Sequence, residues 1–147
     1  LPVMLPMQYK GLAGDERTII KKIINESAIQ DILLIDEDVS PVVTLNLFKG
    51  AALAIGHKTH SVVYGLAMAT PTLAICYHEK TRFFMRQFGV EFYAVNDTAL
   101  EICLLEKKIE MLLDNSVEIK KELFDRRLKV QAELNSLFTL NFDKLIN

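Results

Sequence analysis

The sequence alternates between short apolar runs of strand length and segments whose apolar residues recur at helical spacing. Strand-like runs lie at residues 3–7, 32–35, 51–55, 72–76 and 91–95. A segment with helical character follows each of them, and a further amphipathic stretch closes the chain at 117–138. Five strand–helix repeats predict a parallel sheet with helices on both faces. Strands that are apolar throughout are typical of a sheet buried on both sides.

Capping and turn residues predict where several of the helices begin or end. Asp15 is a candidate N-cap, after a loop that Gly11 and Gly14 indicate. Ser40-Pro41 has the order of an N-cap followed by proline at the first helical position. Gly89 fits the end of a helix at 79–88.

We therefore expect an α/β fold with a single domain, a mostly parallel five-stranded sheet and a long C-terminal helix. The domain would span residues 1–113, and residues 114–147 would form a helical extension packed on it. Leu123, Val130, Leu134, Leu137 and Phe138 fall on one face of that last helix. The alternative is that this face reaches a second domain.

The composition narrows the class of protein. Half of the 147 residues are hydrophobic and the formal net charge is −2, which favours a globular chain and argues against a general nucleic-acid binder. Cys76 and Cys103 match no zinc or disulfide spacing, so we predict no metal site and two buried, reduced thiols, as in a cytoplasmic protein. The longest uncharged run, 61–77, is shorter than the roughly 20 residues of a membrane span. The chain shows no signal peptide and no initiator Met, so we expect a fragment.

Polar side chains concentrate where two of the predicted strands end. Ligands of open parallel sheets bind beyond the carboxyl ends of the strands, which here selects loops beginning near Gln8, Asp36, Gly56, Tyr77 and Asn96. We expect all five loops at one edge. The loops after Gly56 and Tyr77 hold all three histidines of the chain: His57, His60 and His78.

These two loops have the chemistry of an anion site with a proton donor. Each leads into a helix, whose free N–H groups suit phosphate or carboxylate, and Lys58 and Lys80 add positive charge. Histidine is the side chain best suited to acid catalysis near neutral pH. The alternative is that the Lys and His side chains are only solvated and that Thr59 or Ser61 is a simple N-cap. Neither a Walker loop nor a Gly-x-Gly-x-x-Gly loop is present.

The segment Gly56-His57-Lys58-Thr59-His60 resembles the Gly-x-Arg-x-His segment of the polysaccharide pyruvyl transferase family. The resemblance continues through an apolar helix, the Thr70-Pro71 strand start and a Tyr-x-x-Lys loop at Tyr77 to Lys80. Leu5-Pro6-Met7-Gln8 with Asp15, and Phe88-Gly89-Val90, also match, so it covers most of residues 1–97. Lys58 departs from the family's usual Arg; it keeps the charge but loses the bidentate fork.

The resemblance implies two Rossmann-like halves in a GT-B-like arrangement, of which this chain is the C-terminal, donor-binding half. The missing N-terminal half would be its partner, so the isolated fragment is expected to be inactive. The reaction would transfer a pyruvyl group from phosphoenolpyruvate to hydroxyls of a cell-surface or exopolysaccharide sugar, with no cofactor besides this donor. The enzyme would be cytoplasmic, brought to the inner face of the membrane by a lipid-linked acceptor.

The resemblance also ranks the site residues. His60 matches the motif histidine and would be the catalytic acid. Lys58, Thr59, Ser61, Lys80 and His57 would bind the donor, with His57 at the variable position of the motif.

Two other functions fit the same pattern. A nucleotide-sugar glycosyltransferase domain of GT-B type would bind a nucleoside diphosphate, with Asp36 to Asp38 as candidate ribose contacts. A non-catalytic Rossmann-like binding module would instead use the apolar face of 117–138 for a partner.

Overall fold

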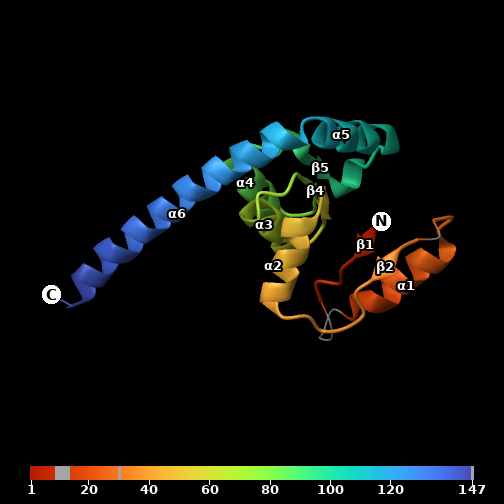
Figure 1. Ribbon diagram of the computed structural model, residues 1–147, viewed down its shortest axis with the longest axis horizontal. Helices are drawn as coiled ribbons and strands as arrows, with labels where there is room; N and C mark the ends of the chain where they lie inside the picture. Colours follow the sequence, from red (N-terminus) through yellow and green to blue (C-terminus); the bar gives the residue numbers. More distant parts are fainter. Residues whose placement is uncertain (9–13, 30, 147) are drawn as a thin grey trace. The chain divides into compact units, whose positions relative to one another are not determined.

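Two separate parallel sheets, of two and three strands, organise the computed structural model (Figure 1). The structure describes residues 1–8, 14–29 and 31–146. The chain divides into two compact units, Leu1–Val43 and Thr44–Asn147, and each is described by itself.

The first unit pairs two very short strands. β1 (Val3–Met4) lies parallel to β2 (Leu33–Leu34), with Val3 opposite Leu33. Between them in sequence is α1 (Glu16–Glu26), whose predicted N-cap is confirmed, because the Asp15 carboxylate accepts from the Arg17 backbone N–H at 3.0 Å. None of the α1 residues is buried. Of the two loop glycines, Gly14 has a positive φ of 91°, whereas Gly11 lies outside the described residues.

The second unit holds the three-stranded sheet in the order β3-β4-β5. Its strands are β3 (Ala54–Gly56), β4 (Thr72–Cys76) and β5 (Ala94–Asn96), all parallel. Helix α2 (Pro41–Gly50) precedes β3 and begins at the predicted Ser40-Pro41 signal; the Ser40 hydroxyl accepts from Val43 N–H at 3.3 Å. The connecting helices are α3 (Thr59–Ala67) and α4 (Glu79–Gln87). Gly89, with a φ of 75°, follows α4 as predicted.

Two glycines let α3 approach the sheet closely. A Cβ on Gly56 would lie 2.6 Å from Val62 Cγ2 and 2.8 Å from Ser61 Oγ. A Cβ on Gly65 would collide with Thr72 Oγ1, and would lie 3.4 Å from the Ala54 Cβ. The absence of side chains at these positions therefore sets the distance between the helix and the strands that carry the polar loops.

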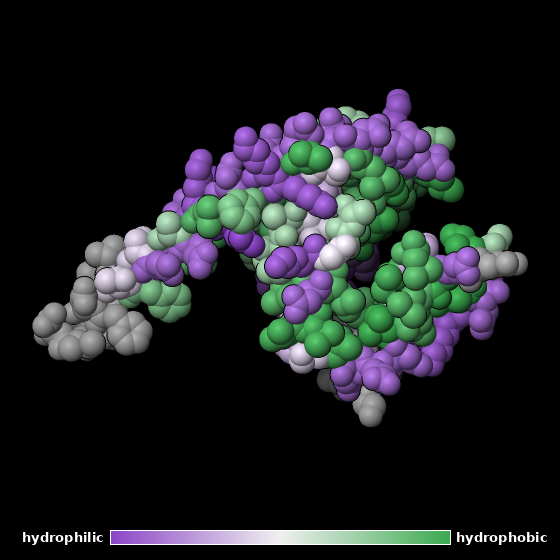
Figure 2. Space-filling model, in the orientation of Figure 1, coloured by the Kyte–Doolittle hydropathy of each residue, from purple (hydrophilic) through white to green (hydrophobic). Residues whose placement is uncertain are grey.

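The last two helices complete the core of the second unit. Two single-turn 3₁₀ helices, η1 (Glu91–Tyr93) and η2 (Asp97–Ala99), flank β5 and are followed by α5 (Ile102–Asp114) and α6 (Ser116–Ile146). Leu112 of α5 and Ile119 and Leu123 of α6 are buried in the same cluster as Leu66 of α3. Figure 2 shows hydrophilic side chains along the outer face of α5 and of the first part of α6.

Two arginines of α6 form hydrogen bonds to the ends of α3 and α4. Arg126 donates to the Gln87 carbonyl at the end of α4, and Arg127 donates to the Ala67 carbonyl at the end of α3 at 3.2 Å. Farther along α6, Leu134, Leu137 and Phe138 are 51–66% exposed. Within the described residues, no helix has the length and apolar character that crossing a membrane requires.

The predicted single five-stranded sheet is wrong. Among the described residues, β1 and β2 pair only with each other. β3 is an edge strand whose Ile55 is 54% exposed, so the three-stranded sheet is not buried on both faces throughout. An apolar run shows that a segment can be buried, but it does not specify which strand it pairs with. The run at 91–95 begins as a 3₁₀ turn, and the terminal helix extends beyond 117–138. The boundary between 1–113 and 114–147 stays a prediction.

Candidate functional site

The candidate site lies where β3 and β4 end. Parallel pairing sets Gly56 opposite Ala74, so the loops 57–58 and 77–78 leave the same edge of the sheet. α3 begins at Thr59 and α4 at Glu79, directly after these loops. The two segments that hold all three histidines are therefore neighbours, as the sequence pattern predicts.

A hydroxyl pair and a group of rings join the two segments. Thr59 Oγ1 lies 2.8 Å from Thr81 Oγ1, which links the first turns of α3 and α4. The His57 ring stacks on Tyr77, with centroids 4.7 Å apart and planes at 25°. The His78 ring also contacts Tyr77, at a centroid distance of 4.1 Å.

Basic residues occupy the N-cap positions of both helices. Lys58 caps α3 and His78 caps α4, and neither side chain makes a capping hydrogen bond. The alternative that Thr59 or Ser61 is the N-cap is wrong, because both lie inside α3, and the Ser61 hydroxyl donates back to the Lys58 carbonyl at 2.6 Å. Helix starts favour negative charge and N-caps that accept hydrogen bonds. Both helices thus have a basic cap, but only α3 lacks an acidic residue in its first turn, whereas α4 has Glu79 there. A bound anion would supply the negative charge that the start of α3 lacks.

The predicted site residues on α3 and α4 differ in exposure. His60 and Lys80 are exposed on the first turns of α3 and α4, whereas Lys58 and Thr59 are half-buried and Ser61 is buried. Of the residues proposed to bind the donor, Lys58, Thr59 and Ser61 lie at the start of α3, and Lys80 lies in the first turn of α4.

The charge around these loops is positive although the chain as a whole is slightly acidic. In 56–61 and 77–82 the one acidic residue is Glu79, and Arg86 lies 3.3 Å from its carboxylate. Arg82, which sequence reasoning missed, donates to Asn96 Oδ1 at 2.7 Å and so joins α4 to the end of β5. Its position one turn after the second loop is the signal that could have identified it.

The other loops selected from sequence are placed differently. Those at Gln8 and Asp36 belong to the first unit, so the prediction that five loops share one edge is wrong along with the single sheet. Asp36 is engaged by Lys21 Nζ at 2.7 Å. Within the described residues, no three His, Cys, Asp or Glu side chains gather in a way that could hold a metal ion.

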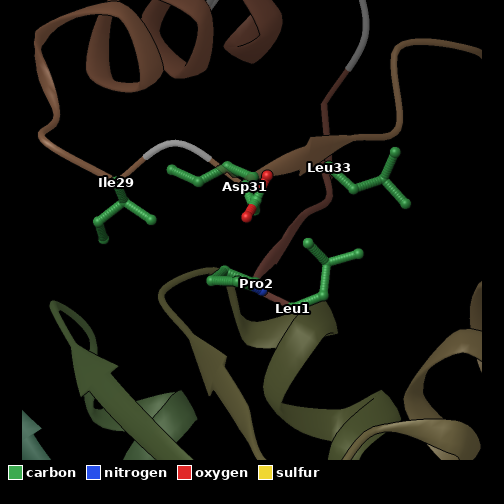
Figure 3. Close-up of a pocket in the computed structure, with 6 residues that line it drawn as sticks. Leu1, Pro2, Ile29, Asp31 and Leu33 are labelled. Carbon is green, nitrogen blue, oxygen red and sulfur yellow. The ribbon is translucent and has the colours of Figure 1, made fainter.

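An open hollow of about 660 Å³ lies in the first unit (Figure 3). Its lining comprises Leu1, Pro2, Ile29, Asp31, Ile32 and Leu33. These side chains are apolar apart from one carboxylate, and none is a predicted site residue. The hollow therefore lacks the cations that an anionic donor needs.

The two cysteines differ in environment. Cys76 is buried as predicted, and burial raises the pKa of its thiol. Cys103 is exposed on α5, so the prediction of a buried thiol there is wrong. A protonated, buried thiol is a poor nucleophile, which leaves the histidines and lysines as the reactive groups at this edge.

Comparison with known proteins gives one partial similarity. The chain is 31% identical over 77 residues to the amylovoran biosynthesis protein AmsJ of Erwinia amylovora, a match that covers 52% of this chain and 19% of that protein. The chain thus spans about a fifth of the length of this relative. No family model matches the sequence, and no solved structure matches it.

Proposed function

We propose that this chain is the donor-binding part of an enzyme of polysaccharide biosynthesis that transfers a pyruvyl group from phosphoenolpyruvate to sugar hydroxyls. The observation that carries the proposal is the pair of neighbouring helix starts capped by Lys58 and His78. Phosphoenolpyruvate brings a phosphate and a carboxylate, and two adjacent helix starts offer N–H donors for two anionic groups.

The partial similarity supports the polysaccharide assignment. The relative's name attaches it to the biosynthesis of amylovoran, an exopolysaccharide. The sequence resemblance to pyruvyl transferases is independent of that name and supplies the reaction. Under this proposal the acceptor is a glycan, the rest of the enzyme closes the other side of the site, and no further cofactor is used. Synthesis would take place in the cytoplasm, at the inner face of the membrane when the acceptor is lipid-linked.

Each site residue has a role in this chemistry. Lys58 and Lys80, with the N–H groups at Thr59 and Ser61, hold the donor anions, and His57 adds a further contact. His60 gives a proton to the methylene carbon of the enol, which leaves a cation-like centre at the carbon that bears the phosphate. One sugar hydroxyl adds to that centre and returns its proton to His60. A second hydroxyl displaces the phosphate, which leaves with the proton of that hydroxyl, and the product is the cyclic ketal.

Replacement of His60 in the full-length protein tests the catalytic role. For His60→Ala we expect the rate of phosphoenolpyruvate-dependent ketal formation to fall by about 10²- to 10⁴-fold. Lys58→Ala should mainly raise the KM for phosphoenolpyruvate, because it removes donor binding. Lys107→Ala, an exposed lysine on α5, is the matched control and should leave both constants unchanged. Turnover by His60→Ala at the wild-type rate would remove His60 from the mechanism.

Calorimetry separates this proposal from the nucleotide-sugar alternative. The site should bind phosphoenolpyruvate, and a nucleoside diphosphate should bind more weakly. Asp36, a candidate ribose contact, is already paired with Lys21 and lies 3.9 Å from Arg17 Nε, which does not favour a ribose role. Tight binding of a nucleoside diphosphate without binding of phosphoenolpyruvate would replace the pyruvyl transferase proposal.

A further inference from the structure

Three rings from the two loops are in contact at the carboxyl edge of the sheet: Tyr77 stacks on His57 and is tilted against His78. Tyr77 contacts His57 of the first loop and His78 of its own loop. All three side chains are exposed, with Tyr77 at 36%. These ring contacts therefore form at the surface and do not come from burial in the hydrophobic core.

An exposed imidazole normally samples several rotamers, and binding a ligand in one of them costs conformational entropy. Stacking on a neighbouring ring restricts those rotamers before the ligand arrives. Here one phenol ring restricts two imidazoles, one from each loop. His57 directly precedes the N-cap of α3 and His78 is the N-cap of α4, so the residues that carry the restricted rings adjoin the two helix starts in sequence.

The same region contains the other groups that an anion needs. The Thr59–Thr81 hydroxyl contact holds the first turns of α3 and α4 together, and Lys58 and Lys80 belong to these segments. Glu79, the acidic side chain in this region, forms an ion pair with Arg86. An oxyanion placed here meets donors and positive charge from both loops.

We infer that Tyr77 is a positioning residue that holds the imidazoles of His57 and His78 in place to bind an oxyanion, phosphate or carboxylate, at the starts of α3 and α4. The identity of that oxyanion as part of phosphoenolpyruvate rests on the proposed function. The role of Tyr77 itself rests on the ring contacts. This role gives His57 more weight in anion binding than its variable position in the sequence motif suggests. It also adds His78, which the motif does not include, to the anion-binding residues.

Three substitutions test the inference. Tyr77→Leu removes the ring, whereas Tyr77→Phe keeps the ring and loses only the hydroxyl. Phe83→Leu is the matched control, because Phe83 is 48% exposed on α4 and packs against Phe84. Affinity for phosphoenolpyruvate and for inorganic phosphate is measured by calorimetry. The ring protons of the histidines are followed by NMR, and with three histidines in the chain single substitutions identify each signal.

We expect Tyr77→Leu to weaken binding of both anions by about three- to tenfold, the effect of one or two side chains that must be immobilised on binding. It should also shift the His57 and His78 signals towards positions of unstacked rings. Tyr77→Phe should restore both signals and stay within about twofold of the wild-type affinity, and Phe83→Leu should change neither.

The outcomes distinguish this inference from the proposed function. Unchanged anion affinity in Tyr77→Leu, with the histidine signals shifted, overturns the positioning role and leaves pyruvyl transfer intact. Binding of inorganic phosphate that depends on Tyr77, without binding of phosphoenolpyruvate, supports the positioning role and overturns the proposed donor. If the wild-type protein binds neither anion, the inference is overturned, even when NMR confirms the ring contacts.

Discussion

The hydroxyl oxygens of Thr59 and Thr81 lie 2.8 Å apart and connect the first turns of two helices that follow neighbouring strands. Thr81 is fully buried, so its hydroxyl depends on protein partners rather than on water. The contact joins residues 22 positions apart in sequence and fixes the spacing of the two loops that carry the histidines.

Replacing either threonine by valine keeps the shape and removes the hydrogen bond. We expect Thr59→Val and Thr81→Val each to lower the free energy of unfolding by about 1–2 kcal/mol, measured by urea denaturation. The double variant should lose less than the sum of the two, because both changes remove the same contact. Thr98→Val, at an exposed position, is the control. Strict additivity of the two losses would show that the hydroxyls do not interact.

A side chain at Gly65 is predicted to destabilise the fold. Gly65→Ala should lower the free energy of unfolding by about 1–3 kcal/mol, because the new methyl group would collide with Thr72 Oγ1. Gly50→Ala, at the end of α2 with open space around it, should leave stability unchanged or slightly higher. Adding Thr72→Ala to Gly65→Ala should recover part of the loss. Equal stability of the two alanine variants would contradict the close approach of α3.

The Arg86–Glu91 pair should make the free energy of unfolding depend on pH in a specific direction. Arg86 donates to both Glu91 carboxylate oxygens at 2.9 Å, and this hydrogen bonding lowers the pKa of Glu91. A carboxylate whose pKa is depressed in the folded state stabilises the fold above its unfolded pKa, about 4.3 for Glu, and loses that contribution as the pH falls through the folded pKa.

Glu91→Gln should therefore be less stable than wild type at pH 7, with the difference shrinking below about pH 4. Because both side chains are solvent-accessible, 0.5 M salt should reduce the effect. Urea unfolding across this pH range measures it, and Glu110→Gln, which removes an exposed carboxylate of α5, is the control. A difference that grows towards acid would reverse the sign argued here.

Substitutions in helix α6 should lower the free energy of unfolding more near its start than farther along it. Leu123 is fully buried, so Leu123→Ala is expected to cost about 2–5 kcal/mol of unfolding free energy. Leu134 is 51% exposed, and Leu134→Ala should change stability by less than about 0.5 kcal/mol. Thermal or urea unfolding of both variants checks the difference. A large loss in Leu134→Ala would mean that this part of α6 is covered in solution.

Local signals in the sequence identified individual elements well. The apolar run 72–76 is β4 with the same bounds, and the Asp15 and Ser40 caps form as predicted. These features depend on residues a few positions apart, which a sequence pattern records directly.

Strand pairing and the His57–Tyr77 stacking depend on residues that are distant in sequence, so they could not be predicted in the same way. The runs at 3–7 and 32–35 were recognised, but their separation from the other three strands was not. The two polar loops were identified, whereas the position of Tyr77 between His57 and His78 follows from the register of β3 against β4.

The arginine contacts of α6 also have a consequence for the order of folding. The Thr59–Thr81 contact spans 22 residues, whereas Arg126 and Arg127 reach carbonyls 39 and 60 positions away. Closing a longer loop costs more chain entropy, and contacts between nearby residues form sooner. During synthesis the two loops can thus come together while α6 is still emerging from the ribosome, and docking of α6 then secures an edge that is already assembled.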